Sequence, residues 1–199
     1  MANTNLPWGL TPVRYRSGAM YNGAANIYHI PASFGTAMFL GDPVVPVTAA
    51  ADANGIPNVT LAAAAGGSFV LGSIVGFVAA GDPPVVRTRD STVYRLASTE
   101  AYVLVADDPD LLFEVQEDAV GGALAVTAGS RNADLVSGTG NVNTGRSGWM
   151  LDSSTLAVTA TLQLRIMRPV ERADNEPGVA NAKWLVSINL HNVRSTLGI

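Results

Sequence analysis

The amino-acid sequence predicts an all-β fold: a single domain of barrel or jelly-roll-like sandwich type, with an extended N-terminal arm and long loops. Apolar residues come in short runs bounded by Gly, Pro, Asn and Asp, which is the pattern of strands and turns. Turn signals recur about every 8–12 residues, a spacing typical of sandwiches and barrels. A chain of 199 residues is long enough for one domain with its own core.

The expected strands, in chain order, occupy residues 27–30, 44–47, 69–71, 74–78, 85–88, 92–96, 102–106, 112–116, 156–166 and 184–191. The last has the clearest pattern, since every second residue is apolar on the face formed by Trp184, Val186, Ile188 and Leu190. This period of two predicts a half-buried strand. The alanine-rich stretch 49–65 instead favours a loop with one short helical turn, because Asn-Gly-Ile-Pro divides it.

Two stretches outside these strands are expected to contact other proteins. Residues 1–21 read as an extended N-terminal arm on a β domain of residues 22–199, and residues 128–148 read as a long polar loop. Aromatic and arginine side chains dominate interface hot spots. The predicted partner-contact residues are therefore Trp8, Arg14, Tyr15, Arg16, Tyr21, Arg131 and Arg146.

The composition argues against several classes of protein. Only 14% of residues are charged, below the ~25% of ordinary soluble domains, which suggests that much of the surface meets other protein. The net charge of −4 argues against a nucleic-acid partner. Lys183 is the one lysine and lies in no phosphate-binding triplet, and the absence of cysteine excludes disulfides and thiolate chemistry. The apolar stretch 69–80 is too short to span a membrane, and no signal peptide is visible. The protein is therefore expected to be made and kept on the cytoplasmic side, or to be released by a route other than a signal peptide.

No catalytic, cofactor or metal site is predicted. Seven acids lie between Glu100 and Asp118 and could form a solvated turn, a Ca²⁺ site or a docking face for a basic partner. His29 and His191 lie in strand-like runs and are expected to be structural, since no nucleophile motif accompanies them. An enzyme that cleaves glycans with a pair of carboxylates also stays open as a hypothesis, although no pattern in the sequence selects a particular pair.

Four phrases, in order along the chain, resemble the capsid decoration (cement) and minor virion structural proteins of tailed bacteriophages. Residues 6–14 are similar to an opening G-[FL]-x-P-V-R, and residues 41–44 to a G-D-P-V turn. Residues 105–116 resemble a D-D-P-x-x-x-F-E-[VI]-Q phrase, and residues 186–191 a closing V-x-[IF]-N-x-H strand. Residues 49–68 and 128–148 match no such motif.

The resemblance implies a non-enzymatic role on the outside of the phage head. A decoration protein would bind the assembled capsid, bridge subunits of the major capsid protein and stabilise the shell, commonly as a homotrimer. It would be made in the host cytoplasm and end on the capsid surface of the virion. Another virion role stays open as the alternative: a tail-tube, head-fibre or receptor- or carbohydrate-binding component.

Overall fold

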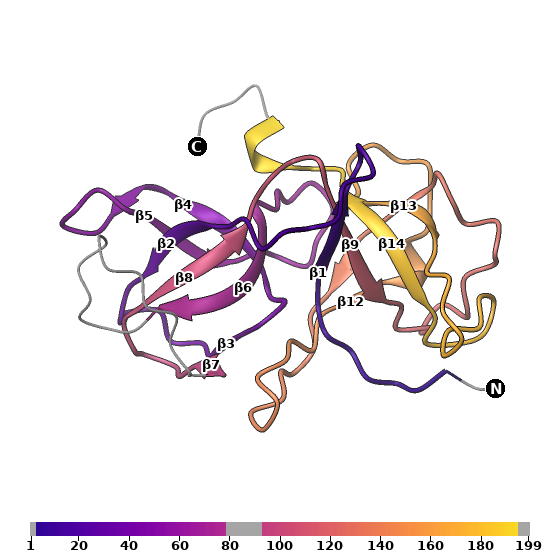
Figure 1. The fold of residues 1–199 in the computed structure, drawn as a ribbon, viewed down its shortest axis with the longest axis horizontal. Helices are drawn as coiled ribbons and strands as arrows, with labels where there is room; N and C mark the ends of the chain where they lie inside the picture. The colour runs from indigo at the N-terminus through magenta and orange to yellow at the C-terminus, as the bar shows by residue number, and fades with distance from the viewer. Residues whose placement is uncertain (1–2, 79–92, 195–199) are drawn as a thin grey trace.

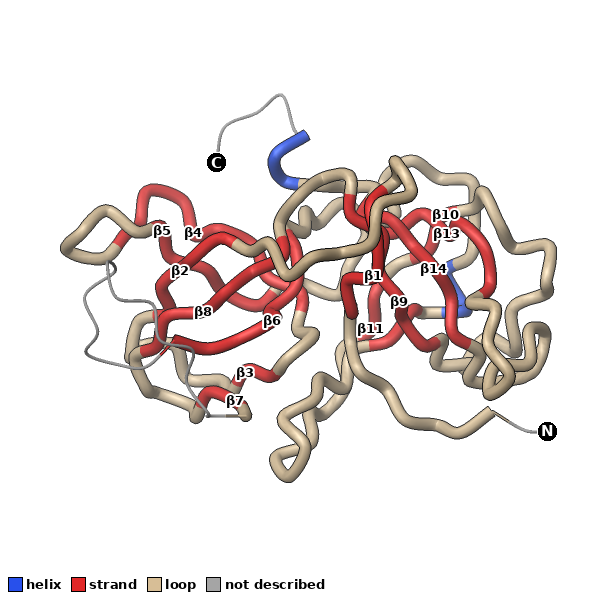
Figure 2. The backbone as a smooth tube through the Cα atoms, in the orientation of Figure 1, coloured by secondary structure: helices blue, strands red, loops and turns tan. Residues whose placement is uncertain are grey.

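The computed structural model describes residues 3–78 and 93–194, and nearly all of its regular structure is β (Figures 1 and 2). The strands are β1 (Thr11–Tyr15), β2 (Asn26–Ile30), β3 (Met38–Phe39), β4 (Pro43–Ala51), β5 (Pro57–Leu61), β6 (Gly72–Val78), β7 (Tyr94–Arg95), β8 (Ala101–Ala106), β9 (Leu111–Gln116), β10 (Asn132–Ala133), β11 (Leu135–Val136), β12 (Met150–Leu151), β13 (Leu164–Pro169) and β14 (Lys183–Ile188). Two 3₁₀ turns, η1 (Ser153–Thr155) and η2 (Asn192–Arg194), complete the described elements. The all-β prediction is confirmed.

Most strands belong to one of two assemblies that lie side by side (Figure 2). A closed barrel has the strand order β2-β5-β4-β6-β8, and a five-stranded antiparallel sheet has the order β1-β9-β14-β13-β10. The ribbons β3-β7 and β11-β12 add two short pairs. The turn of residues 107–110 joins β8 of the barrel directly to β9 of the sheet, so the two assemblies are linked at the middle of the chain.

Each assembly encloses a hydrophobic cluster. Inside the barrel, Ile30, Val44 and Phe77 pack with their neighbours. The sheet packs Phe113 and Trp184 against the side of the molecule that holds the β11-β12 ribbon. Ala106 and Val70, at the junction with the barrel, belong to the cluster of the sheet, so the two parts share buried surface.

Strand β14 confirms the period-two prediction for residues 184–188, ends at Ile188 and not at His191 as predicted, and is buried more completely than predicted. Trp184, Val186 and Ile188 all point into the sheet's cluster. The opposite face was expected to meet solvent, yet Ser187 is fully buried. Arg16 covers it, with Nη2 donating to the Ser187 Oγ at 2.9 Å.

The alanine-rich stretch 49–65 is a β-hairpin, which corrects the predicted loop and helical turn. Strands β4 and β5 pair in antiparallel fashion around it. The Asp52 carboxylate accepts hydrogen bonds from the backbone nitrogens of Asn54 and Ile56, both at 2.8 Å, and Gly55 takes the left-handed conformation with φ 82°. The Asp-Ala-Asn-Gly turn therefore decides the structure against the helical propensity of alanine.

Other strand predictions differ in extent. Residues 69–71 form only an isolated bridge, between Val70 and His191. Residues 156–163 are irregular, and β13 begins at Leu164. The predicted strand 85–88 lies outside the described residues. Among the residues that are described, no helix is long and apolar enough to cross a membrane.

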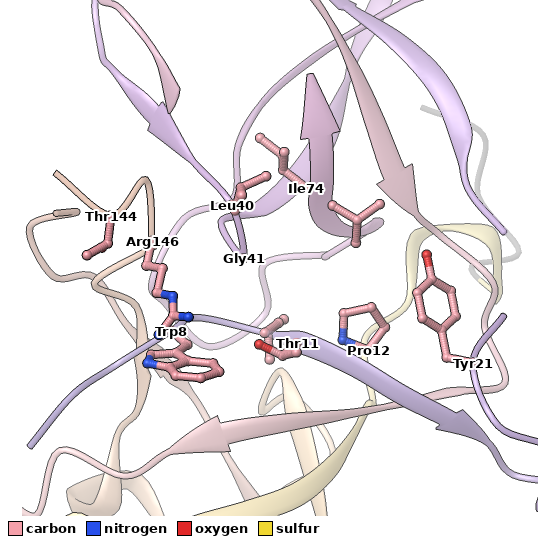
Figure 3. Close-up of a pocket in the computed structure, with 11 residues that line it drawn as sticks. Trp8, Thr11, Pro12, Tyr21, Leu40, Gly41, Ile74, Thr144 and Arg146 are labelled. Atoms are coloured by element: carbon pink, nitrogen blue, oxygen red, sulfur yellow. The ribbon is translucent and has the colours of Figure 1, made fainter. Parts of the chain in front are cut away.

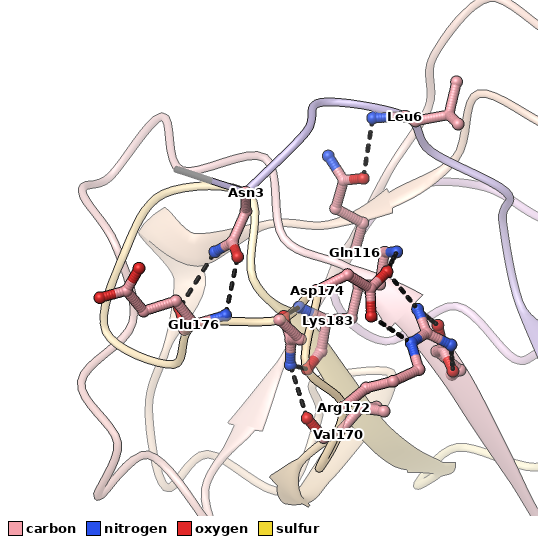
Figure 4. A network of polar contacts seen from close by, with 10 residues as sticks. Asn3, Leu6, Gln116, Val170, Arg172, Asp174, Glu176 and Lys183 are labelled. Atoms are coloured by element: carbon pink, nitrogen blue, oxygen red, sulfur yellow. Dashed lines mark hydrogen bonds and ion pairs between the residues drawn. The ribbon is translucent and has the colours of Figure 1, made fainter. Parts of the chain in front are cut away.

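Within the segment predicted as an N-terminal arm, the described residues 3–21 lie along the sheet of their own chain. Strand β1 pairs with β9 and forms one edge of the sheet. Before it, the Asn3 side chain accepts a hydrogen bond from the Glu176 nitrogen at 2.7 Å, and the Leu6 nitrogen donates to Gln116 Oε1 at 3.0 Å (Figure 4). Leu10 is fully buried. Burial of apolar surface therefore holds this segment on its own chain.

The predicted polar loop 128–148 is only partly a loop. Asn132, Ala133 and Leu135 are buried in β10 and β11. Residues 137–144 form the exposed part, which projects from the molecule near β12 (Figure 1). An isolated bridge between Asn141 and Arg146 closes this projection and returns the chain to the core.

Candidate functional site

A groove lies where β1 of the sheet meets β6 of the barrel (Figure 3). Its volume is about 420 Å³, within the range of ligand and peptide sites. We call it the Trp8 groove. Its lining is mainly apolar, and none of the described residues that form it is acidic: Trp8, Leu10, Thr11, Pro12, Tyr21, Leu40, Gly41, Ile74, Val75, Thr144 and Arg146.

Backbone hydrogen bonds fix the segments that build the Trp8 groove. The Leu10 nitrogen donates to the Gly41 carbonyl at 2.9 Å, and the Gly41 nitrogen donates to the Ile74 carbonyl at 2.8 Å. The Ser147 nitrogen donates to the Leu40 carbonyl at 2.9 Å. Segments from four parts of the sequence are thus tied together, so the walls are preformed before any partner arrives.

Close approach of these backbones requires glycine at two positions. A Cβ at Gly9 would lie 2.2 Å from the Gly41 carbonyl oxygen, and one at Gly41 would lie 2.1 Å from the Trp8 carbonyl oxygen. Both glycines also have positive φ angles, 67° and 92°. Only glycine combines this conformation with this proximity, and the pair determines where Trp8 sits.

Asp42 anchors the floor of the groove from inside the protein. It is buried, and its Oδ2 accepts a hydrogen bond from the Phe39 nitrogen at 2.8 Å. Burial raises the pKa of this carboxyl to about 6. The hydrogen bonds from Ser147 and Phe39 lower the pKa, but their effect is smaller than that of burial. The Asp42 side chain therefore ties the β3–β4 turn to the segment that carries Arg146.

Trp8 and Arg146 form the rim of the groove. The Arg146 guanidinium carbon lies 3.5 Å from the centroid of the Trp8 ring, and Lys183 Nζ lies 5.9 Å from the same centroid. Such cation–π contacts contribute about 0.5–1 kcal/mol at exposed sites. Trp8 is 37% exposed, whereas Trp149 and Trp184 are buried. Trp8 is therefore the tryptophan that a partner can reach.

Arg146 has no carboxylate partner within residues 3–78 and 93–194. Arg172, by contrast, pairs with Glu114 at 3.1 Å and with Asp174 at 2.7 Å (Figure 4). Lys183 pairs with Asp174 at 3.4 Å. The Trp8 groove thus carries a positive charge that the described part of the chain leaves uncompensated.

Of the other predicted partner-contact residues, one lines the Trp8 groove and the rest lie elsewhere on the molecule. Tyr21 lines the Trp8 groove, with its hydroxyl donating to the Ala24 carbonyl at 3.0 Å. Arg14 lines a second groove of about 210 Å³ on the sheet, beside Glu114 and Glu171. Tyr15 and Arg16 pack on the sheet, and Arg131 donates to the Leu156 carbonyl at 3.4 Å, away from both grooves.

The histidines and the acidic segment make structural contacts. His29 nitrogens lie 2.8 Å from Asn58 Oδ1 and 3.0 Å from Glu100 Oε1. His191 is buried, which lowers its pKa to about 4. Asp107 accepts hydrogen bonds from Tyr28 at 2.6 Å and from Asn26 at 3.0 Å. No group of three or more potential metal ligands occurs in the part of the chain that the structure describes.

Sequence reasoning selected Trp8, Tyr21 and Arg146 separately and did not predict that they meet. It missed the aliphatic floor, to which Leu40 and Ile74 contribute. Nothing in their local pattern distinguishes these residues from ordinary core positions, because the groove exists only once the barrel and sheet are joined.

Comparison of the chain with protein-family models, with curated proteins and with solved structures gives no match.

Proposed function

We propose that this chain is a decoration protein of a tailed-bacteriophage head, which binds the outside of the assembled capsid and stabilises it by bridging subunits of the major capsid protein. The observation that carries the proposal is the rim of the Trp8 groove, where an exposed tryptophan stacks on an arginine that has no carboxylate partner among the described residues. Trp and Arg are the residues most enriched at the centres of protein interfaces. The four sequence phrases that resemble phage decoration proteins, in the same order along the chain, support a capsid protein as the partner.

The all-β architecture fits a role as a clamp. The edge of β1 is covered by the chain itself, since the Tyr21 nitrogen donates to the Val13 carbonyl at 3.0 Å and the Tyr15 nitrogen to the Ala19 carbonyl at 2.8 Å. A covered edge prevents uncontrolled strand pairing between copies at high density on a shell. Binding only to the assembled lattice would stabilise that lattice by mass action, and a homotrimer would add avidity.

Heads that lack this protein provide the test. Purified protein is added, bound protein is measured by co-sedimentation, and the temperature at which the heads release DNA is recorded. We expect saturable binding and a higher release temperature. Trp8→Ala should weaken binding about 30-fold, the effect of losing one hot spot, while Val158→Ala, an exposed residue outside the groove, should leave it unchanged. Binding to isolated tails and not to heads would refute the proposal.

A further inference from the structure

We infer that the Trp8 groove binds an extended segment of a partner protein in which a carboxylate side chain lies next to an aliphatic or aromatic one. This inference rests on the proposed function, and it specifies the chemistry of the capsid segment that the groove would recognise. It is carried by two features of the groove in the described part of the chain: a guanidinium at the rim that no carboxylate compensates, and an apolar floor to which no acidic residue contributes.

The guanidinium of Arg146 determines the charge of the occupant. Stacking on Trp8 holds it at the rim, and in the described part of the chain no acceptor occupies its N–H groups. A planar guanidinium binds a carboxylate through two parallel hydrogen bonds, stronger than neutral ones. The groove that Arg14 lines does not offer this opportunity, because Glu114 and Glu171 also line it and supply negative charge.

The floor of the groove determines what stands beside that carboxylate. Leu40 and Pro12 present half-buried aliphatic surface, and Tyr21 closes the far end (Figure 3). Burial of an apolar side chain there removes both surfaces from water, at about 25 cal/mol per Å². A phosphate group would find one cation and an apolar floor, a poor match for a strongly hydrated anion.

Recognition occurs through side chains and not through strand addition. A partner strand could pair with β1 only if the free edge of β1 offered backbone donors and acceptors. That edge is occupied: the Leu10 nitrogen bonds to Gly41, and residues 19–21 bond to Val13 and Tyr15. Pro12 contributes no N–H at all. Specificity therefore depends on the charge and the apolar side chain of the occupant.

The test uses overlapping twelve-residue peptides that together cover the major capsid protein, and a second set that covers the tail proteins. Binding to the full-length chain is followed by the fluorescence of Trp8, with Trp8→Phe as the blank. We expect binding by peptides that carry Asp or Glu within two residues of Leu, Ile or Phe. Amidation of that acid, or Arg146→Glu in the protein, should weaken binding at least tenfold, whereas Arg131→Glu should not.

A charge swap gives the most specific result. A peptide whose acid is replaced by lysine should bind Arg146→Glu better than it binds the unaltered protein. Several outcomes overturn the inference: equal binding of acid and amide peptides, competition by inorganic phosphate or duplex DNA, self-association that Arg146→Glu abolishes, or no peptide bound while heads are bound.

The inference and the proposed function fail in different ways. If heads bind the protein and Arg146→Glu binds them equally well, the function stands and the inference is wrong. If acidic–apolar peptides from tail proteins bind with the expected charge dependence and head peptides do not, the inference stands and the head location is wrong.

Discussion

Replacement of Gly9 by alanine should destabilise the protein strongly, because the added Cβ has no room at the Trp8 groove. The new Cβ would lie 2.2 Å from the Gly41 carbonyl oxygen and 2.6 Å from the Ser147 Cβ, so backbone must move. Overpacking of this kind costs about 1–3 kcal/mol. The left-handed conformation, φ 67°, adds about 1–2 kcal/mol for a residue with a Cβ. We expect a total loss of roughly 2–5 kcal/mol in the free energy of unfolding.

Gly18→Ala is the matched control, because Gly18 also has a positive φ, 95°, but no atom lies within 4 Å of its added Cβ. This variant should lose only the conformational part, about 1–2 kcal/mol. Urea unfolding followed by tryptophan fluorescence measures both variants, with the slope of the transition as a check on two-state behaviour. If Gly9→Ala and Gly18→Ala differ by less than about 1 kcal/mol, close packing at Gly9 does not hold the groove together.

Three further predictions concern buried polar groups. Trp184→Phe removes the 3.0 Å hydrogen bond from Trp184 Nε1 to the buried Glu117 carboxylate, and urea unfolding should show a loss of about 2–4 kcal/mol; a loss below 1 would contradict this role. The folded-state pKa of Asp42, about 6, exceeds its ordinary value of 3.8, so its contribution to stability is full below pH 4 and declines as pH rises through 6. Between pH 4 and 7.5 the stability of the unaltered protein relative to Asp42→Asn should therefore fall by on the order of 3 kcal/mol, and a constant difference would disprove the assignment. Arg95 donates to the carbonyls of four residues at 2.6–3.1 Å, so Arg95→Lys should lower the melting temperature by several degrees, whereas Arg131→Lys, with one such bond at 3.4 Å, should leave it unchanged.

Local sequence patterns predicted strands in which apolar and polar residues alternate strongly. They failed at the β4–β5 hairpin, where the turn residues favour a hairpin and the alanine-rich composition favours a helix. Strand β14 could be predicted because a period of two in Trp184, Val186 and Ile188 has only one good structural solution. The hairpin of β4 and β5 could not be predicted from alanine propensity. Its turn depends on Asp52 bonding two backbone nitrogens, an interaction stronger than the small preference of alanine for helix.

The site could be predicted only as separate residues. Trp8 and Arg146 are types that favour interfaces, but their stacking depends on contacts between distant parts of the chain. The packing of the predicted arm against the sheet could not be predicted for a related reason: the polar composition of residues 1–21 conceals Leu10, which is completely buried. Sequence composition reports average exposure, whereas the pairing of β1 with β9 depends on long-range contacts that no local pattern encodes.

The most direct test of the surface-binding role is a cryo-EM map of heads reconstituted with this protein. We expect density for the chain on the outer surface of the shell, at junctions between subunits of the major capsid protein. Within it, Trp8 and Arg146 should contact a capsid segment that carries a carboxylate beside an apolar side chain. A shell without this density, or a bound chain whose Trp8 groove faces solvent, would contradict the proposal.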